Sequence, residues 1–238
     1  MRLAGQARAK RAKTGLSIAA LLITAGCGAS GDYDPGVRPE DFQSRVDHRL
    51  FPLPVGARWV YSGTTAQGLE RIEVEVLPET KTVAWGAVAT VVKDTAFMDG
   101  EKVEETWDWY AQHRDGSVWY LGEDTAEYEN GMIVNHAGAW EAGVDGALPG
   151  IVMMSTPEVG AKYRQEYYQG EAEDYGEIVA LDAGATVPGG SWTACVKTHD
   201  TSAIDAALDE LKTYCPGVGL TLVEEGTVRV ELVRYSGL

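Results

Sequence analysis

The middle third of the sequence combines aromatic rings with carboxylates, two side-chain types that bind small polar ligands. Four tryptophans fall within 34 residues and form a candidate aromatic platform: Trp107, Trp109, Trp119 and Trp140. The acids interleaved with them give the candidate ligand or metal-binding residues Glu105, Glu123, Asp124, Glu141, Asp145, Glu166, Glu173 and Asp174. Flat rings can stack on a sugar or surround a cationic group, while carboxylates bind hydroxyl groups, positive charge or Ca²⁺.

Glu105 is the candidate for acid–base chemistry. In a strand over residues 103–110, alternation places Glu105 on the same face as Trp107 and Trp109. A carboxylate desolvated beside these rings would have a raised pKa, the first requirement of a general acid. The alternative is that the aromatic residues belong to the core and the acids to the solvated face, as is usual for strands.

Other kinds of chemistry have little support in the sequence. It has no Gly-rich phosphate loop, no G-x-S-x-G elbow, no His-Glu-x-x-His pair and no contiguous EF-hand loop. The four histidines are widely spaced and show no metal-ligand spacing. The formal net charge of −16 excludes a nucleic-acid partner, because phosphate binding draws its affinity from clustered Lys and Arg.

The N-terminus has the features of an export signal. Residues 1–13 carry five bases and no acid, and the apolar run 16–25 that follows is too short to cross a bilayer as a permanent helix. Thr24-Ala25-Gly26-Cys27 resembles the lipobox of bacterial lipoproteins, although Thr24 stands where Leu is usual. We therefore expect residues 1–26 to be a lipoprotein signal peptide and Cys27 to be lipidated. The alternative is a plain secretory signal with an incidental Cys27.

Lipidation would place the protein on a membrane surface. Acyl chains such as palmitate can hold a protein on a bilayer without spanning it. By the same resemblance, Gly28 after the cysteine implies the outer membrane of a two-membrane bacterium, or otherwise the outer face of the cytoplasmic membrane. The chain after residue 26 is strongly acidic, with 15 bases against 36 acids and a net charge of −21.

Cys195 and Cys215 form an even pair, for which a disulfide is the default in an exported protein. Residues 191–197 and 211–215 both have the character of strands, and a turn near Asp205 would place the two cysteines opposite each other. The alternative is two free buried thiols.

The rest of the chain favours a mainly β fold. We expect a flexible tether at 27–50 and one β-rich domain at 51–238, an antiparallel sheet that forms an open barrel or a sandwich with little helix outside the signal peptide. Further strands are expected at 58–62, 69–76, 85–92, 118–121, 163–168, 177–181, 219–224 and 228–233. Turn signals at Asp99-Gly100, Asp115-Gly116 and Asn130-Gly131 separate several of them, and only 202–212 offers a helical pattern.

Several segments are similar to an uncharacterised group of exported bacterial proteins. They cover most of residues 51–220 and are Phe51-Pro52-Leu53 with Gly56, Trp59 and Tyr61; Asp108-Trp109-Tyr110-Ala111-Gln112; Val118-Trp119-Tyr120 with Gly122-Glu123-Asp124-Thr125; Trp140-Glu141-Ala142-Gly143-Val144-Asp145-Gly146-Ala147 with Pro149-Gly150; Gln165-Glu166-Tyr167-Tyr168; Ala172-Glu173-Asp174; and Tyr214 with Pro216-Gly217-Val218-Gly219. The resemblance implies a shared β-rich fold with an acidic and aromatic surface, and it implies no reaction. Cys215 stands where such proteins usually have a small apolar residue.

These observations predict a lipid-anchored, extracytoplasmic binding protein. Its acidic and aromatic surface would engage a cation, with Ca²⁺ as the possible cofactor, a saccharide or another envelope component. The expected partners are the membrane, through the N-terminal lipid, and this small ligand or envelope component. Two alternatives stay open: a hydrolase that uses two of the carboxylates as acid and base, and a scaffold without a small ligand.

Overall fold

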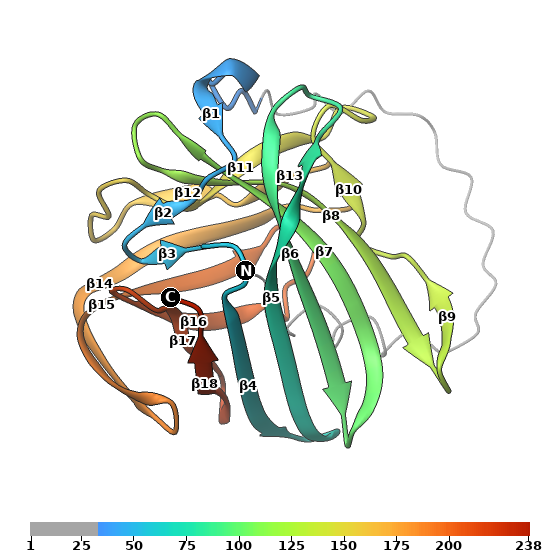
Figure 1. Ribbon diagram of the computed structural model, residues 1–238, viewed down its shortest axis with the longest axis vertical. Coiled ribbons are helices and arrows are strands. Elements are labelled where there is room, and N and C mark those ends of the chain that lie inside the picture. Colours follow the sequence, from blue (N-terminus) through green and yellow to red (C-terminus); the bar gives the residue numbers. More distant parts are fainter. Residues whose placement is uncertain (1–32) are drawn as a thin grey trace.

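The structure is a computed structural model that describes residues 33–238, so the expected signal peptide 1–26 and Cys27 lie outside the described residues. One antiparallel sheet dominates it (Figure 1). In spatial order its main path is β12 (Lys162–Arg164), β14 (Asp174–Val187), β15 (Gly190–Ser202), β16 (Asp209–Cys215), β17 (Gly219–Glu225), β18 (Val228–Ser236), β4 (Arg58–Thr65), β5 (Gly68–Thr82), β6 (Val88–Met98), β7 (Glu101–His113), β8 (Val118–Glu129), β11 (Leu148–Met153) and β13 (Glu166–Tyr167).

Short elements complete the described chain. Three strands pair at the side of the main path: β1 (Phe42–Gln43) with β7, and β9 (Met132–Asn135) and β10 (Trp140–Glu141) with β8. A separate small sheet joins β2 (Asp47–His48) to β3 (Phe51–Pro52). Among the described residues, the 3₁₀ turn η1 (Pro39–Asp41) is the one helical element, and no helix is long and apolar enough to cross a membrane.

The sheet curls until its two end strands lie close together, and the expectation of an antiparallel open barrel is confirmed. The end strands β12 and β13 are separated in sequence by Gln165 alone. The Gln165 N–H donates to the carbonyl of Asp174 on β14 (2.8 Å), while Glu166 pairs with Pro149 of β11. This region, residues 162–167 with the facing residues of β11 and β14, is the seam of the barrel.

Period-two alternation gives the sheet an inner and an outer face. The inner face carries the main core, in which Tyr61, Ile72, Tyr110 and Tyr120 are completely buried. Part of the outer face is also covered: Phe42 of β1 and other residues of 37–43 pack on β6, β7 and β8 and bury a second apolar cluster. Residues on both faces of β6–β8 are therefore buried, as the apolar run 85–92 indicated.

The hairpin turns fall where the sequence predicted them. Asp99 and Asn130 have φ values of 51° and 52°, a left-handed conformation that Asp and Asn tolerate, and each is followed by glycine in a tight turn. The helical pattern at 202–212 forms no helix. It divides between the end of β15, a turn and β16, because strand pairing on both sides overrides the local pattern.

Residues 33–50, expected to be part of the flexible tether, instead pack on the barrel. Val46 and Leu50 are 2% and 4% exposed within the main core, and Phe42 pairs with His113 of β7. Their side chains bury against the domain although they follow no regular period.

The predicted bridge between Cys195 and Cys215 is confirmed. Val196 of β15 pairs with Tyr214 of β16, so the two cysteines lie at adjacent, opposed positions with their Cα atoms 4.3 Å apart. The hairpin that joins them is the one expected from the sequence.

Candidate binding site

Several acids lie on the inner face of β5–β8, and we call five of them, Glu70, Asp94, Glu104, Asp108 and Glu123, the inner acidic wall. The register places them together. Asp94 of β6 pairs with Thr106 of β7, so that Glu104 and Asp108 are its diagonal neighbours on the same face. Asp108 in turn pairs with Glu123 of β8. Diagonal neighbours on a sheet face lie roughly 7–8 Å apart, near enough for their charges to interact.

Asp94 is buried among the other acids of the wall. It is 7% exposed, and its Oδ2 has no hydrogen-bond partner. Burial, together with the charges of Asp108 and Glu104, raises the pKa of Asp94 well above its ordinary value. The cost of leaving a buried carboxylate oxygen without a partner is relieved when a donor or a positive charge binds beside it.

Hydroxyl groups hold other acids of the wall in place. The Tyr120 hydroxyl donates to Oδ1 of Asp108 (2.5 Å), and Thr125 Oγ1 donates to Oε2 of Glu123 (3.0 Å). Thr106 Oγ1 lies 3.2 Å from Thr125 Oγ1, which connects neighbouring strands. The carboxylates of Asp108 and Glu123 are therefore oriented before any ligand arrives, a condition for tight recognition.

Aromatic rings continue the inner face next to the wall. Tyr110 and Tyr120 stack with their centroids 4.9 Å apart, and Trp140 meets Tyr120 edge to face at 5.5 Å. Trp140 is 5% exposed, and its Nε1–H has no hydrogen-bond partner. The site thus combines carboxylates, electron-rich ring faces and a buried donor without a partner.

On β7 and β8 the acids of the inner face become more exposed toward one end of the barrel, whereas Glu70 on β5, near the same end, is 4% exposed. Asp108 and Asp94 are buried, whereas Glu104 and Glu127, on the next row of the inner face, are half-buried. The β6/β7 and β8/β9 turns follow and are exposed at Gly100 and Asn130. In Figure 1 both turns lie in the lower part of the picture.

The barrel interior holds far more acid than base. Of the described residues, eight acids but a single base, Lys212, are buried. Lys212 lies on β16, away from the wall, and its Nζ is 2.9 Å from Asp200 and 3.2 Å from Glu210. Burial would lower the pKa of Lys212, but the two carboxylates outweigh it and raise that pKa well above its ordinary value. Lys212 is thus committed to Asp200 and Glu210.

Glu105 does not have the predicted properties of a general acid. It shares a face with Trp107 and Trp109 as expected, but that face is the outer one. Burial alone would raise its pKa, but hydrogen bonds and charge from Lys93 (2.8 Å) and Lys102 (3.5 Å) outweigh burial and lower the pKa. The prediction of a raised pKa is wrong because these two lysines, on β6 and β7, reach the same outer surface.

The structure disperses the other candidate acids. Asp124 and Asp145 are exposed, and Glu141 accepts the N–H of Ala84 (2.6 Å) and pairs with Lys81 (3.1 Å). At the seam, Glu173 pairs with Arg164, Glu166 is fully buried on β13, and Asp174 is buried on β14. Of the eight, Glu123 alone belongs to the inner acidic wall.

The four tryptophans do not form one platform. Trp109 and Trp119 belong to the outer apolar cluster, against which Trp107 packs. Phe42 lies over them, with its ring 5.8 Å from Trp119. Trp140 is on the inner side, next to Tyr120. The alternative that these aromatic residues are core describes Trp109 and Trp119 well, because residues 37–43 cover the surface they would have exposed.

Sequence reasoning missed Asp94 and Glu70 and left Asp108 and Glu104 outside the candidate set. The alternation of inward- and outward-facing residues along the strand could have identified Asp94. Continuing the strand at 85–92 to Met98 places Asp94 two residues from Val92 and two from Ala96, both of which face the core. An acid at a core-facing position is the unusual observation, more informative than an acid that alternates in step with tryptophans.

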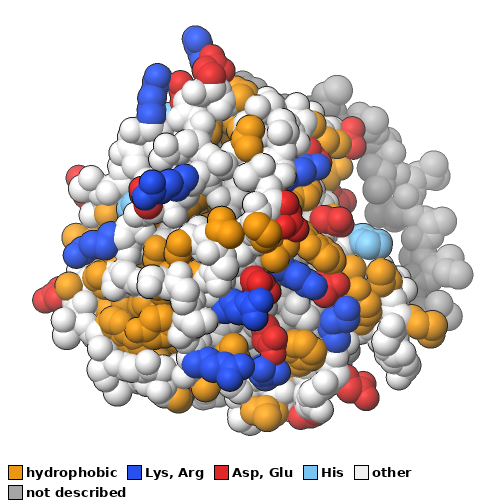
Figure 2. Space-filling view, in the orientation of Figure 1, with side chains coloured by type: hydrophobic (Ala, Val, Ile, Leu, Met, Phe, Trp, Pro, Cys, Tyr) orange, Lys and Arg blue, Asp and Glu red, His pale blue; other side chains and the backbone are white. Residues whose placement is uncertain are grey.

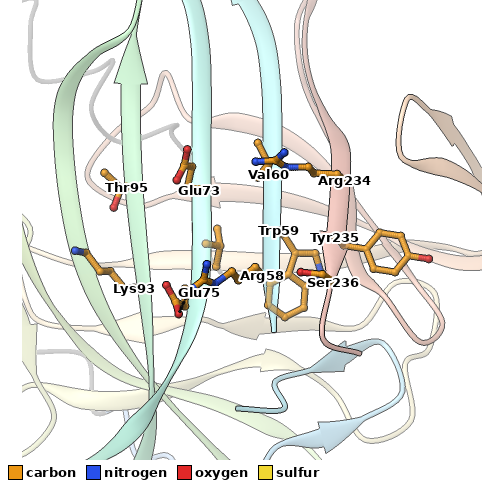
Figure 3. A pocket seen from close by; sticks show the side chains of 11 residues that line it. Arg58, Trp59, Val60, Glu73, Glu75, Lys93, Thr95, Arg234, Tyr235 and Ser236 are labelled. Atoms are coloured by element: carbon orange, nitrogen blue, oxygen red, sulfur yellow. Dashed lines mark hydrogen bonds and ion pairs between the residues drawn. The ribbon is translucent and has the colours of Figure 1, made fainter. Parts of the chain in front are cut away.

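A groove of about 470 Å³ crosses the outer face of β18, β4, β5 and β6 (Figure 3). Arg58, Glu75 and Lys93 line it, but Arg58 pairs with Glu75 (2.6 Å) and Lys93 pairs with Glu105. Figure 2 shows basic and acidic side chains interspersed over this face. Most of the charged side chains in the groove are therefore already paired with a neighbour. We expect the groove to attract a charged ligand less strongly than the inner acidic wall does.

A second hollow, of about 580 Å³, lies between residues 44–55 and 77–80 and includes Leu53, Pro54 and Leu77. Its lining combines aliphatic side chains and three prolines with polar residues such as Arg45, Asp47 and Glu79. Among residues 33–238, no group of three or more His, Cys, Asp or Glu side chains is arranged to hold a metal ion.

No protein-family model matches the sequence, and no curated protein sequence is significantly similar to it. Two solved structures are similar. One is described as a putative lipoprotein from Parabacteroides distasonis, with 16% identity and a TM-score of 0.41. The other is described as a putative exported protein with a YmcC-like fold from Bacteroides fragilis, with 10% identity and a TM-score of 0.43. Each alignment covers 79% of this chain and 98% of the other. Both similarities are too distant to indicate a function.

Proposed function

We propose that this chain is an exported, lipid-anchored binding protein that holds a positively charged organic group against the inner acidic wall. The buried Oδ2 of Asp94, which has no hydrogen-bond partner, is the observation that carries the proposal. A cation at this point would stabilise the charged form of Asp94, which burial and the neighbouring acids now disfavour.

Export and anchoring are supported by the N-terminal sequence and by the disulfide. Five bases, a short apolar run and Cys27 have the order found in lipoprotein signals. The Cys195–Cys215 bridge fits an oxidising compartment outside the cytosol. These features support an extracytoplasmic location.

An ammonium-bearing organic ligand fits the inner face best. The ring faces of Tyr110 and Tyr120 lie next to Asp108, and such rings attract an organic cation while they exclude water from it. The partner-free Nε1–H of Trp140 adds a donor for a hydroxyl or carbonyl oxygen of the same ligand. The expected ligand class is therefore an amine that also carries oxygen, of which an amino sugar is a simple example.

Calorimetric titration of the mature, membrane-extracted protein at neutral pH tests the ligand class. The probes are glucosamine, ethanolamine and spermidine, with N-acetylglucosamine as the neutral counterpart of glucosamine and CaCl₂ as the metal alternative. We expect binding of an amine probe and no binding of N-acetylglucosamine. Binding of CaCl₂ alone, or of glucosamine and N-acetylglucosamine with equal affinity, would contradict the proposal.

Matched variants locate the binding site. Asp94→Asn removes the charge at the wall, and the loss of a charged hydrogen bond of about 1.5–3 kcal/mol corresponds to at least about tenfold weaker binding. Asp124→Asn removes an acid of the same type from the exposed side of β8 and should leave the affinity unchanged. Equal weakening by both variants would indicate a general electrostatic effect and would contradict a site at Asp94.

A further inference from the structure

Nearly all the bases of the described chain are paired with acids. Within residues 33–238, every lysine and arginine except Arg49 and Arg234 forms an ion pair with a described carboxylate. Arg49 is exposed between β2 and β3, whereas Arg234 lines the groove of about 470 Å³ on the outer face of β18, β4, β5 and β6, which we call the outer groove. An arginine without an acid partner is unexpected where acids far outnumber bases.

A β-bulge in β18 directs Arg234 into the outer groove. Leu232 and Arg234 pair with adjacent residues of β4, so that Val233 is an extra residue on β18. In a regular strand, Leu232 and Arg234 would point to the same face, which is the buried inner one. The bulge instead places Arg234 opposite Val60 on the outer face, and its side chain extends over β4 toward Glu73 (Figure 3). Bulges beside functional sites often redirect a side chain in this way.

The charges that face the outer groove leave Arg234 in excess. The acids in its lining are Glu73 and Glu75. Glu73 pairs with Arg71, and Glu75 pairs with Arg58 (2.6 Å). An anion that bound to Arg234 would therefore gain a guanidinium without breaking an existing ion pair between described residues.

The pairing register also brings hydroxyl groups into the outer groove. Ser236 follows Arg234 by two residues on the outer face of β18, and Thr95 of β6 lies in the same cross-strand row as Arg234. Three strand spacings, roughly 14 Å, separate β18 from β6. This width and the volume of the groove suit a small organic molecule, because such sites usually enclose roughly 300–1,000 Å³.

We infer that the outer groove binds a small hydroxylated molecule through its anionic group, a carboxylate or a phosphate, with Arg234 as the main anion-binding residue. A planar guanidinium donates two parallel hydrogen bonds to either group. Ser236 and Thr95 can bind hydroxyl groups of the same molecule. The site goes beyond the proposed function, since it lies on the other face of the sheet from the inner acidic wall and selects the opposite charge.

Calorimetric titration of the mature, membrane-extracted protein at neutral pH tests the inference. The probes are glucuronic acid for the carboxylate and glucose 6-phosphate for the phosphate, with glucose as their neutral counterpart. We expect at least one of the two anions to bind and glucose not to bind. Binding of neither anion, or binding of glucose as tight as that of the anions, would overturn the inference.

Two arginine variants locate the anion. Arg234→Gln should weaken binding of the anionic probe at least about tenfold, because a charged hydrogen-bond donor is lost. Arg49→Gln removes the other base without an ion pair in the described chain, at an exposed position outside the outer groove, and should leave the affinity unchanged. Equal weakening by both variants would show a general effect of charge and would overturn the assignment to Arg234.

A third variant should strengthen binding. Glu75→Gln removes an acid from the outer groove and releases Arg58, so we expect the affinity for the anionic probe to rise about two- to fivefold. Glu177→Gln is the matched control, because it breaks a similarly exposed pair with Lys162 (3.0 Å) away from the groove and should leave the affinity unchanged. An affinity that stays the same or falls in Glu75→Gln would count against the outer groove.

The same variants separate this site from the inner acidic wall. Asp94→Asn should leave binding of the anionic probe unchanged, and Arg234→Gln should leave binding of the amine probe unchanged. Loss of anion binding in Asp94→Asn would overturn a separate site on the outer face, whereas failure of the amine titration alone would leave the outer groove intact.

Discussion

Asp94 and Asp108 lie on neighbouring antiparallel strands, displaced by two residues in register, with both carboxyl groups on the inner face of the barrel. Both are buried, and the charge of Asp108 is among the causes that raise the pKa of Asp94. Such an arrangement opposes folding at neutral pH, because it holds two acids in a poorly solvated space. A cationic ligand at the wall would relieve this cost.

Asp94→Asn should stabilise the ligand-free protein at neutral pH. Because the pKa of Asp94 is raised in the folded state, the folded state binds its proton more tightly than the unfolded state. This contribution to stability is complete below the ordinary pKa of an aspartate and is lost as the pH rises toward the folded value. Urea denaturation of both proteins at pH 4 and pH 8 should show the advantage of the variant growing at the higher pH. A variant less stable than wild type at pH 8 would contradict this.

Lys212→Met should destabilise the protein by about 3–5 kcal/mol, since it leaves Asp200 and Glu210 buried without their cation. Lys197→Met is the control, because Lys197 and Glu224 form a more exposed pair whose loss costs about 1 kcal/mol or less. Chemical denaturation measures both changes. Similar losses of unfolding free energy in the two variants would contradict a larger stabilising role for the buried ion group than for the more exposed pair.

The contribution of Lys212, Asp200 and Glu210 to the free energy of unfolding should depend on pH. Burial would raise the pKa of Asp200, but Lys212, Gln165 and Thr198 outweigh it and lower that pKa. A lowered folded pKa gives stability that is present above the ordinary aspartate pKa and is lost as the pH falls through the folded value. The stability difference between wild type and Lys212→Met should therefore narrow in strong acid. A difference that is constant from neutral pH to pH 2 would count against this assignment.

Glu105→Gln should cost about 0.5–1 kcal/mol at neutral pH and leave ligand binding unchanged, because Glu105 pairs with Lys93 and Lys102 on the outer face. Its lowered pKa means that the cost disappears as the pH falls and the wild-type glutamate becomes protonated. Glu101→Gln, at an exposed position on the same strand, serves as the control. Loss of binding in Glu105→Gln alone would place the site on the outer face instead.

Loss of the Cys195–Cys215 bridge should cost about 3 kcal/mol, the chain-entropy value for a loop of this size. Replacing both cysteines with alanine and comparing urea midpoints measures it. The double variant should no longer respond to a reducing agent, whereas the wild type should lose stability on reduction. A midpoint unaffected by reduction in the wild type would contradict a stabilising bridge.

Fold class and pairing followed from local signals. Alternation over 69–76 and the turn residues Asp99 and Asn130 were enough to predict hairpins, and Cys195 and Cys215 occupy opposed positions because the intervening turn fixes the register. The seam and the end strands β12 and β13 were not predictable in the same way. They depend on how far the whole sheet curls, which no short segment specifies.

The candidate site was less predictable because one face of β7 had to be chosen without tertiary information. Both faces of this strand are buried, one by the barrel and the other by residues 37–43. Tryptophans at alternate positions therefore did not show which face is the inner one. Asp94 lay outside the predicted strand and escaped notice. Residues 33–50 had no regular period, and their burial therefore came from contacts distant in sequence, such as Phe42 with Trp119.

The ionisation of Asp94 tests the central claim most directly. Carboxyl ¹³C NMR of the mature protein gives the pKa of Asp94 with and without the amine probe that binds best, and Asp94→Asn identifies its signal. We predict a raised pKa in the free protein that falls when the amine binds, because a positive charge beside the carboxylate favours its ionised form. A pKa that stays the same at saturating amine would contradict a cationic group at the inner acidic wall.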